Sequence, residues 1–518
     1  MESDPTKAIV IGAGMGGLAS AIRLAAAGFA VTVLERAATP GGKARALPSE
    51  AGPVDAGPTV LTLRHVFDEL FALNGERLDD HVTLIAQTVL ARHWWPDGST
   101  LDLTPDRMAN ADAIRALSGP REAAAFLRFD SLAKDLYDTF QGPVMRAPRP
   151  EARAVARAAL RVPRLWPALL PGLSLDRLLR LHFRDPRLIQ LFGRYATYVG
   201  GRPAHSPAVL ALIWQAEARG VWGVQGGMHR LAAALADLAA RMGVTFHYDT
   251  GAHRLIRQNG RLTAVQTTKG QAIPCAFCVF NGDPAALSAG LMGNAFTGPD
   301  PAPPSLSAQV WAFAATPAGP RARDLVHHNL FFTADPATEF GPIGRGRMPE
   351  AQTLYLCAED RLSGFVGTGP ERFEIILNAP AALAQSTKDH DLCRTRTFQQ
   401  LQAMGLTFEP LPATTSLTTP KDFDRLFPGS KGALYGRTPE GAMATFQRPT
   451  ARTALAGLYL AGGGTHPGAG VPMAALSGKH AVAAILQDRT SPSTSRPTAT
   501  PGGMSMASRM TGRARSRS

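Results

Sequence analysis

The chain has 518 residues, of which 45% are hydrophobic and 18% charged, a size and composition that predict a folded protein of two domains. Its four cysteines are too few and too scattered for the framework of a disulfide-rich secreted protein, which favours a reducing cytoplasm, and we expect Cys275 and Cys278 to be packing residues. The sequence shows neither a signal-peptide pattern nor a run of about 18 apolar residues, so we expect no membrane-spanning segment.

The net charge of +13 is confined largely to two segments. Residues 146–187 hold ten arginines and three acidic residues, a net charge of +7, and residues 490–518 hold five arginines and no acid. The rest of the chain is nearly neutral, which argues against a nucleic-acid-binding protein and for local contact with an anionic partner. The second segment is rich in Ser, Thr, Pro and Gly, so we expect 490–518 to be a disordered basic tail.

The N-terminal residues predict an α/β fold that begins with the β-α-β unit of a doubly wound, Rossmann-like sheet. Residues 7–11 form an apolar strand, residues 18–27 a helix rich in Ala and Leu, and residues 29–35 a second strand. The turn between the first strand and the helix is rich in glycine. This order of elements is typical of a dinucleotide-binding domain.

The glycines of this turn have the spacing G-x-G-x-x-G. Gly12 permits the tight turn, Gly14 lets a pyrophosphate approach the backbone, and Gly17 lets the helix pack on the strand. Glu35 ends the second strand, where a carboxylate accepts hydrogen bonds from a ribose and repels the 2′-phosphate of NADP. The sequence therefore predicts a dinucleotide site that excludes NADP.

The rest of the chain divides between two domains. After about residue 75 the glycine-loop signals cease, and short strands give way to long helices, which we interpret as an inserted substrate domain. Glycine turns return later, and a last strand, loop and helix close the first domain. We expect the dinucleotide-binding domain to consist of residues 1–74, 220–299 and 446–489, and a mixed α/β substrate domain of residues 75–219 and 300–445.

A second glycine turn and two cations follow Glu35, at Gly42, Lys43 and Arg45. A further loop that exposes backbone groups contains Gly57, Pro58 and Thr59. These runs resemble the FAD-binding segment of the amine oxidase and carotenoid desaturase superfamily. The resemblance implies that FAD is the cofactor and that these residues lie along its pyrophosphate and ribityl groups. In NAD-dependent dehydrogenases this region is usually ordinary chain.

The C-terminal run 459–473 resembles the loop that brings backbone amides onto the flavin in this superfamily, which implies cofactor contacts at Gly463, Gly464 and Met473. Many amine oxidases have an acidic residue near the two glycines, and this chain has none there. That difference, with an aromatic content of only 7%, weakens the amine oxidase interpretation. It favours the carotenoid branch, whose loop commonly reads Gly-x-Gly-Thr-His-Pro-Gly-Ala-Gly.

Over residues 7–487 the chain is similar to bacterial phytoene-desaturase-type carotenoid oxidoreductases. The run 281–284 follows a pattern of that family, which implies a cofactor contact at Asp283. Residues 327–332 and 354–361 look most like the 1-hydroxycarotenoid 3,4-desaturases of photosynthetic bacteria. The resemblance implies an acyclic carotenoid with a tertiary hydroxyl, which loses a hydride from C4 to the flavin and a proton from C3 inside a dry tunnel.

No residue stands out as the general base. His466 is the best candidate, because the resemblance places its loop near the flavin, and a structural role for this histidine is equally open. Arg64, His65 and Glu217 are weaker candidates. Water or a flavin atom is also a sufficient acceptor for a proton next to a delocalised cation, so a dedicated base is not required.

Several functions remain open beside 3,4-desaturation. They are the desaturation of phytoene or neurosporene, a carotenoid isomerisation with reduced FAD, an amine oxidation, and a non-catalytic role as an FAD-binding scaffold. The electron acceptor is also open, and a quinone is one candidate.

Residues 146–187 predict a helical, membrane-facing segment. Arg149, Arg153, Arg157 and Arg161 recur at every fourth residue, which places them on one face of a helix, and leucines, a tryptophan and prolines follow. This pattern is typical of an interfacial segment, with an arginine-rich solvated helix as the alternative. We expect a cytoplasmic protein bound peripherally to the inner, photosynthetic membrane through this segment.

Overall fold

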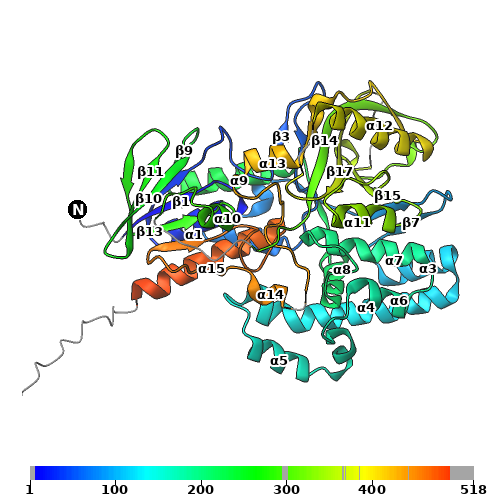
Figure 1. Ribbon diagram of the computed structural model, residues 1–518, viewed down its shortest axis with the longest axis horizontal. Coiled ribbons are helices and arrows are strands. Elements are labelled where there is room, and N and C mark those ends of the chain that lie inside the picture. Colours follow the sequence, from blue (N-terminus) through cyan, green and yellow to red (C-terminus); the bar gives the residue numbers. More distant parts are fainter. Residues whose placement is uncertain are drawn as a thin grey trace, which may run out of the picture.

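The computed structural model describes residues 6–294, 302–364, 367, 369–383, 386–441 and 443–490. Figure 1 shows a domain around a parallel sheet, a second domain around a mixed sheet, and a group of helices beside that second sheet. The last described helix returns to the first domain, so the two ends of the described chain belong to the same domain.

The first domain contains β1 (Lys7–Ile11), α1 (Met15–Ala26), β2 (Ala30–Leu34), α2 (His65–Ala72), α9 (Met228–Arg241), β9 (Thr245–His247), β10 (Ala252–Gln258), β11 (Arg261–Thr267), β12 (Ala272–Pro274), β13 (Phe277–Phe280), α10 (Pro284–Ser288), β20 (Leu458–Leu460) and α15 (Val471–Thr490). Its main sheet is parallel, in the order β20-β13-β1-β2-β9, and the small sheet β10-β11-β12 is antiparallel.

Alternation along β1 explains the layers of this domain. Ala8 and Val10 lie in one core with residues of α1, α9 and α15, whereas Ile9 and Ile11 lie in another core with residues of the small sheet. Because successive side chains of a strand point to opposite faces, the apolar strand β1 packs against a layer of helices on one face and against the small sheet on the other. The carboxyl ends of β1, β2, β13 and β20 then meet at one edge of the sheet.

The second domain is built on a mixed sheet in the order β18-β14-β17-β16-β15-β6-β7, with β19 also paired to β14. The strands are β6 (Ala91–Trp94), β7 (Thr100–Leu103), β14 (Ser307–Ala318), β15 (His328–Phe331), β16 (Leu354–Ala358), β17 (Glu371–Ala379), β18 (Thr407–Glu409) and β19 (Leu417–Thr418). Trp311 and Phe313 of β14 pack against Phe398 of α12 (Thr387–Ala403), which covers one face of the sheet.

The helices beside this sheet are α3 (Arg107–Ser118), α4 (Pro120–Phe140), α5 (Ala152–Leu160), α6 (Leu175–His182), α7 (Pro186–Gly193) and α8 (Leu212–Ala218). In their common core, Phe192 packs against Phe129 in a tilted arrangement and against Trp214 edge to face. The remaining elements are β3 (Ala46–Leu47), β4 (Val54–Asp55), β5 (Leu84–Ala86), β8 (Trp222–Val224), α11 (Ala337–Gly344), α13 (Pro420–Leu426), α14 (Ala444–Gln447) and short 3-10 or π turns, among them η2 (Gln141–Arg146) and η4 (Arg194–Val199).

The predicted α/β fold with a Rossmann-like dinucleotide-binding sheet is confirmed. On the second face of this sheet, the small antiparallel sheet lies where a doubly wound fold has its second layer of helices. The basic helix is shorter than the arginine spacing predicts: α5 ends at Leu160, so Arg149 lies before it and Arg161 at its end. Pro150 and Pro163 flank the helix, and proline limits helical hydrogen bonding. In the described part of the chain, no helix has the length and apolar character needed to cross a bilayer.

Two other predictions concern the cysteines and the tail. Cys275 and Cys278 are buried free thiols, and burial raises the pKa of Cys275 to about 12, as expected for packing residues. Of the predicted tail, Thr490 is the last residue of α15, and residues 491–518 lie outside the described residues.

Candidate functional site

A cavity of about 1600 Å³ extends from the carboxyl edge of the parallel sheet to the second sheet and the helices beside it. The predicted cofactor residues that line it are Gly12, Gly14, Glu35, Gly42, Lys43, Arg45, Gly57, Pro58, Thr59, Asp283, Gly463 and Gly464. Two predicted residues, Gly17 and Met473, are not part of its lining. The carboxyl edge of a doubly wound sheet is where this architecture binds nucleotides.

The first glycine turn is held closed by close backbone contacts. Gly12 has φ +95°, and a Cβ on Gly17 would lie 2.0 Å from the Gly12 carbonyl oxygen. Gly17 therefore allows the helix to approach the turn, as its position in the motif predicts. A Cβ on Gly14 would lie 2.8 Å from Nδ2 of Asn281, a residue that the sequence analysis did not single out as a contact.

The N-cap of α1 is Gly14, which has no side chain to cap the helix, and the first turn of α1 holds no acidic residue. Gly14, Met15 and Gly16 at this end line the cavity. Free N–H groups and the positive end of the helix dipole make such a terminus a site for a pyrophosphate.

Glu35 is 6% exposed and accepts hydrogen bonds from the backbone N–H groups of Ala13 at 2.6 Å and Ala37 at 2.8 Å. Its carboxylate thus joins the glycine turn to the end of β2 while it lines the cavity. Since a carboxylate has about four lone-pair positions, it retains capacity for a ribose hydroxyl.

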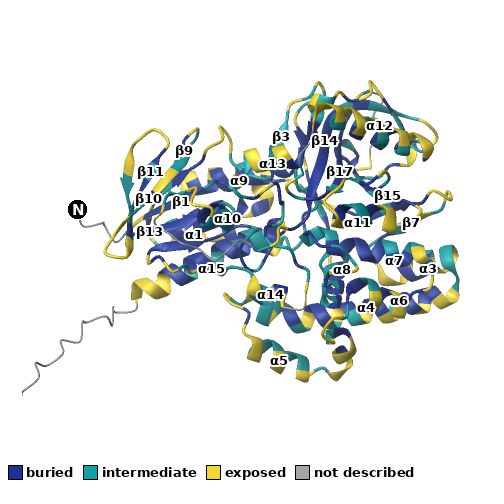
Figure 2. Cartoon of the chain, in the orientation of Figure 1, coloured by how far each residue is buried: buried dark blue, intermediate teal, exposed yellow. Residues whose placement is uncertain are grey.

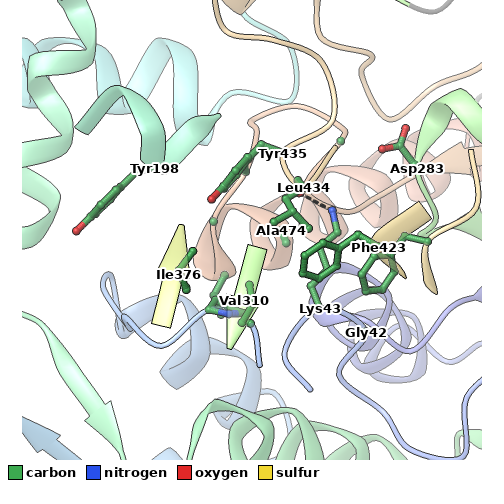
Figure 3. A pocket seen from close by; sticks show the side chains of 18 of the residues that line it. Gly42, Lys43, Tyr198, Asp283, Val310, Ile376, Phe423, Leu434, Tyr435 and Ala474 are labelled. Carbon is green, nitrogen blue, oxygen red and sulfur yellow. Dashed lines mark hydrogen bonds between the residues drawn. The ribbon is translucent and has the colours of Figure 1, made fainter. Parts of the chain in front are cut away.

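The second glycine turn lies on the first. Gly42 has φ +60°, and a Cβ there would lie 3.2 Å from the Gly14 Cα. Lys43 donates to the Leu434 carbonyl (Figure 3). Its ammonium lies 5.4 Å from the centre of the Phe427 ring. Burial lowers the pKa of Lys43, against the opposing effect of Asp283.

Arg45 lies 2.8 Å from Thr418 Oγ1 and 5.8 Å from the centre of the Phe423 ring. Burial lowers its pKa, while Glu374 and Asp422 oppose that shift. Arg45 and Lys43 therefore also tie the glycine turn to the second domain.

The C-terminal loop closes the other side of the site. A Cβ on Gly464 would lie 2.7 Å from Pro284 Cδ, beside Asp283, which accepts from the Ala285 N–H at 2.9 Å and begins α10. Arg448, which sequence reasoning missed, donates to the carbonyls of Gly463 at 3.1 Å and Tyr435 at 3.1 Å. Burial lowers the Arg448 pKa to about 10.

The loop of residues 57–59 joins the two domains. A Cβ on Gly57 would lie 1.9 Å from the Lys43 carbonyl oxygen, so only glycine fits there. Two residues before it, Asp55 accepts from the Met228 N–H and lies 2.9 Å from His229 Nδ1. Asp55 thereby caps α9 of the first domain, while β4, which contains it, lies against β14 and β17 of the second.

His466, the candidate base, does not line the cavity. Its Nε2 is 2.9 Å from the Ala147 carbonyl oxygen, and its ring stacks on His480, whose Nε2 is 3.3 Å from the Met145 carbonyl. Burial lowers the pKa of both histidines, that of His480 to about 4. These contacts give His466 the structural role, because it holds the chain just before α5.

The other side chains named as candidates are also engaged elsewhere. Met473 packs against the core of the first domain, and α15 brings Val471 and Ala474 to the cavity instead. Arg64 pairs with Asp68 and Asp79, and neither Arg64 nor His65 lines the cavity.

Glu217 is bound by two buried side chains and one half-buried side chain rather than facing the cavity. It lies 3.0 Å from Arg194 and 2.6 Å from each of the Tyr195 and Tyr198 hydroxyls. Arg194 and Tyr198 line the cavity, and Tyr198 appears in Figure 3.

A family model for flavin containing amine oxidoreductases matches residues 15–322 and 332–486. The chain belongs to this family. Hydroxyneurosporene desaturase from Cereibacter sphaeroides is 60% identical, covering 94% of this chain and 98% of its own length. The enzyme of the same name from Rhodobacter capsulatus is 59% identical, and the match covers 94% of this chain and 99% of the enzyme's own length.

Solved structures share the fold at low sequence identity. A triple mutant of putrescine oxidase has a TM-score of 0.59 at 14% identity, covering 93% of this chain and 98% of its own. Cyclohexylamine oxidase from Brevibacterium oxydans has a TM-score of 0.58 at 15% identity, and the match covers 93% of this chain and 99% of that enzyme's chain.

These comparisons confirm the predicted resemblance and the cofactor. The protein is an FAD-dependent oxidoreductase. The site fits that cofactor, because the N-terminus of α1, two glycine turns in contact with each other and the buried Glu35 carboxylate all line the same cavity.

Proposed function

We propose that the protein desaturates an acyclic 1-hydroxycarotenoid of the hydroxyneurosporene type at C3–C4. The observation that carries this proposal is one cavity with two kinds of lining. Glycine loops and Glu35 line one part, and apolar side chains line the other, among them Ile189, Leu330, Phe332, Phe340 and Ile376. A lipophilic chain fits the apolar part beside the cofactor. The names of the two most similar relatives described above support the same substrate class.

FAD, when bound, supplies the acceptor for the hydride that leaves C4. The chain itself orients the polyene and excludes water, with Leu330 of β15, Tyr355 of β16 and Ile376 of β17 on the cavity wall. A dry wall prevents water from capturing the cation that forms along the polyene. Because His466 is turned away from the cavity, we do not assign the C3 proton to it.

We also propose that residues 146–187 bind the cytoplasmic surface of the inner, photosynthetic membrane. In the described chain no acidic side chain pairs with Arg153, Arg157 or Arg161, and Figure 2 shows α5 largely exposed. The same segment exposes large apolar side chains: Leu160, Trp166, Leu170 and Leu181.

The end of this segment borders the cavity. Asp176 and Arg180 of α6 are part of the cavity lining, whereas no residue of α5 is. Arginines beside exposed leucine and tryptophan are typical of an interfacial segment. Because a carotenoid dissolves in lipid, a cavity that borders a membrane-bound segment at α6 can receive the carotenoid from the bilayer.

The direct test is to incubate the purified protein with FAD and liposomal 1-hydroxyneurosporene and to follow the polyene absorption and the product mass. Desaturation shifts the absorption to longer wavelength and lowers the mass by two hydrogens. A product of unchanged mass with altered isomer pattern would instead identify an isomerase. Anaerobic flavin that stays oxidised in the presence of carotenoid, with no product, would identify a non-catalytic protein.

Amine oxidation is the second enzyme class to exclude, because it gives the matched family its name. Flavin reduction by simple amines, and not by carotenoid, would replace the proposal. The acceptor that reoxidises the flavin is found in the same assay by adding a quinone or oxygen in turn.

A further inference from the structure

We propose that Thr59, supported by Tyr355 and His328, binds the tertiary hydroxyl of the substrate. This inference rests on the proposed function and names the group that distinguishes a hydroxylated carotenoid from its hydrocarbon analogue. The three side chains come from the cofactor loop, β16 and β15, so they lie where the two domains meet.

A chain of hydrogen bonds ends at the cavity. The Thr59 and Tyr355 hydroxyls lie 2.5 Å apart, and the Tyr355 hydroxyl lies 2.7 Å from His328 Nδ1. Thr59 and Tyr355 line the cavity, whereas His328 is 1% exposed and lies behind them. The order from the cavity inward is therefore threonine, tyrosine and histidine.

This chain has an unused position on the cavity side. Within the described residues, the Thr59 hydroxyl has Tyr355 as its hydrogen-bond partner and no other, and His328 Nε2 has none. Burial lowers the pKa of His328, which keeps the ring neutral. If His328 Nδ1 accepts a hydrogen bond from the Tyr355 hydroxyl, Thr59 donates to Tyr355 and its oxygen can accept a hydrogen bond from a ligand in the cavity. If Nδ1 carries the proton and donates to Tyr355, then Tyr355 donates to Thr59, and the Thr59 hydroxyl can donate to the ligand. Thr59 therefore matches a hydroxyl in either role.

The surroundings of this position are apolar. Leu330 is the cross-strand partner of Tyr355 and lines the cavity. Val60, the residue after Thr59, and Phe332, two residues after Leu330, line it as well. On an apolar wall, one hydrogen-bonding group gives a preference for a substrate that carries a hydroxyl over one that lacks it.

The other polar side chains on this part of the wall are largely engaged by the protein. Tyr198 donates to Glu217, and Asn378 donates to Glu339 at 2.8 Å. Gln190 donates to the Thr333 carbonyl and accepts from the Trp95 indole. Tyr435, shown in Figure 3, is the remaining competitor, because its hydroxyl makes no hydrogen bond within the described residues.

The position of Thr59 along the cavity fits this role. Thr59 directly follows Gly57 and Pro58 of the cofactor loop. In a 1-hydroxycarotenoid, one methylene separates the carbon that carries the hydroxyl from C3. A substrate with C3–C4 at the cofactor therefore has its hydroxyl close to the cofactor loop. Binding this hydroxyl fixes which carbon pair faces the flavin as well as which carotenoid is accepted.

The test compares 1-hydroxyneurosporene with neurosporene, in liposomes, for both equilibrium binding and kcat/KM. Thr59→Val keeps the shape of the side chain and removes its hydroxyl. We expect the preference of kcat/KM for the hydroxylated substrate to fall by about tenfold or more, the worth of one buried hydrogen bond. Thr59→Ser should retain the preference, and Tyr355→Phe should weaken it. Both kinetic constants are expressed per bound flavin, so that a change in FAD content is separated from a change in substrate preference.

Thr197→Val is the matched control. Thr197 also lines the cavity, but its hydroxyl donates to the Arg194 carbonyl at 2.8 Å, so the preference should be retained. An unchanged preference in Thr59→Val, or its loss in Tyr435→Phe alone, would overturn the inference and leave the desaturase proposal standing. If the parental protein desaturates neither carotenoid, the proposed function fails and the inference fails with it.

Discussion

Replacing Glu35 by glutamine tests how the adenosine end of FAD is held. The side chain is almost isosteric, but it loses the charge and turns one acceptor into an amide donor. A hydrogen bond to a charged group contributes about 1.5–3 kcal/mol, so loss of the ribose contact should raise the dissociation constant of FAD by about 10- to 150-fold. The measurement is the binding of FAD to apoprotein, followed by flavin fluorescence.

The same change should reduce the stability of the apoprotein. Glu35 accepts from both Ala13 and Ala37, and an amide group can satisfy only one of these N–H donors. Ala13 is buried, and leaving its N–H without a partner costs about 1–3 kcal/mol in the free energy of unfolding, whereas the N–H of the exposed Ala37 can be hydrated. Glu69→Gln is the control, because Glu69 pairs with Arg23 and Lys479 away from the cavity. A parental dissociation constant for Glu35→Gln would refute the assignment of Glu35 to the ribose.

Three further predictions concern the cofactor, the membrane and pH. Denaturation should release about one FAD per chain, and Gly14→Val should abolish FAD binding, because its side chain would occupy the space of the pyrophosphate; release of a nicotinamide nucleotide alone would contradict the assignment. Changing Arg153, Arg157 and Arg161 to glutamine should weaken binding to anionic vesicles by up to about 1 kcal/mol per arginine, with FAD content intact. Detachment only by truncation after Thr490 would assign the membrane contact to the tail instead. Because burial holds the His480 pKa at about 4, below its ordinary 6.5, the unfolded chain binds the proton first as pH falls, and stability is lost between about 6.5 and 4. Denaturant unfolding at pH 7 and pH 5 should show a loss of about 2 kcal/mol from this residue, which His480→Gln removes.

Local signals made the dinucleotide-binding half of the site predictable. The spacing of Gly12, Gly14 and Gly17 and the position of Glu35 report backbone geometry within one β-α-β unit, and the structure places them as that geometry requires. The second turn at Gly42 was likewise visible, since a glycine is needed where two backbone segments touch.

Contacts between distant segments could not be predicted in this way. Lys43 binds the Leu434 carbonyl across 391 residues of sequence, and Thr59 contacts Tyr355 across 296. The direction of a side chain on a predicted element could not be predicted either. Met473 points toward the core of the first domain, and His466 points toward Ala147, because contacts with segments distant in the sequence decide both.

The cofactor cradle is assembled from both ends of the described chain. The first glycine turn is complete by residue 17, but its sheet neighbours β13 and β20 and the loop at Gly463 follow much later in the sequence. During synthesis, which proceeds at about 5–20 residues per second, the nascent β1-α1-β2 unit must therefore wait for β13, which follows α3 to α8, and for β20, which follows all the strands of the second sheet. FAD can be fully enclosed only when α15 has been made, so cofactor insertion is among the last events in the maturation of this protein.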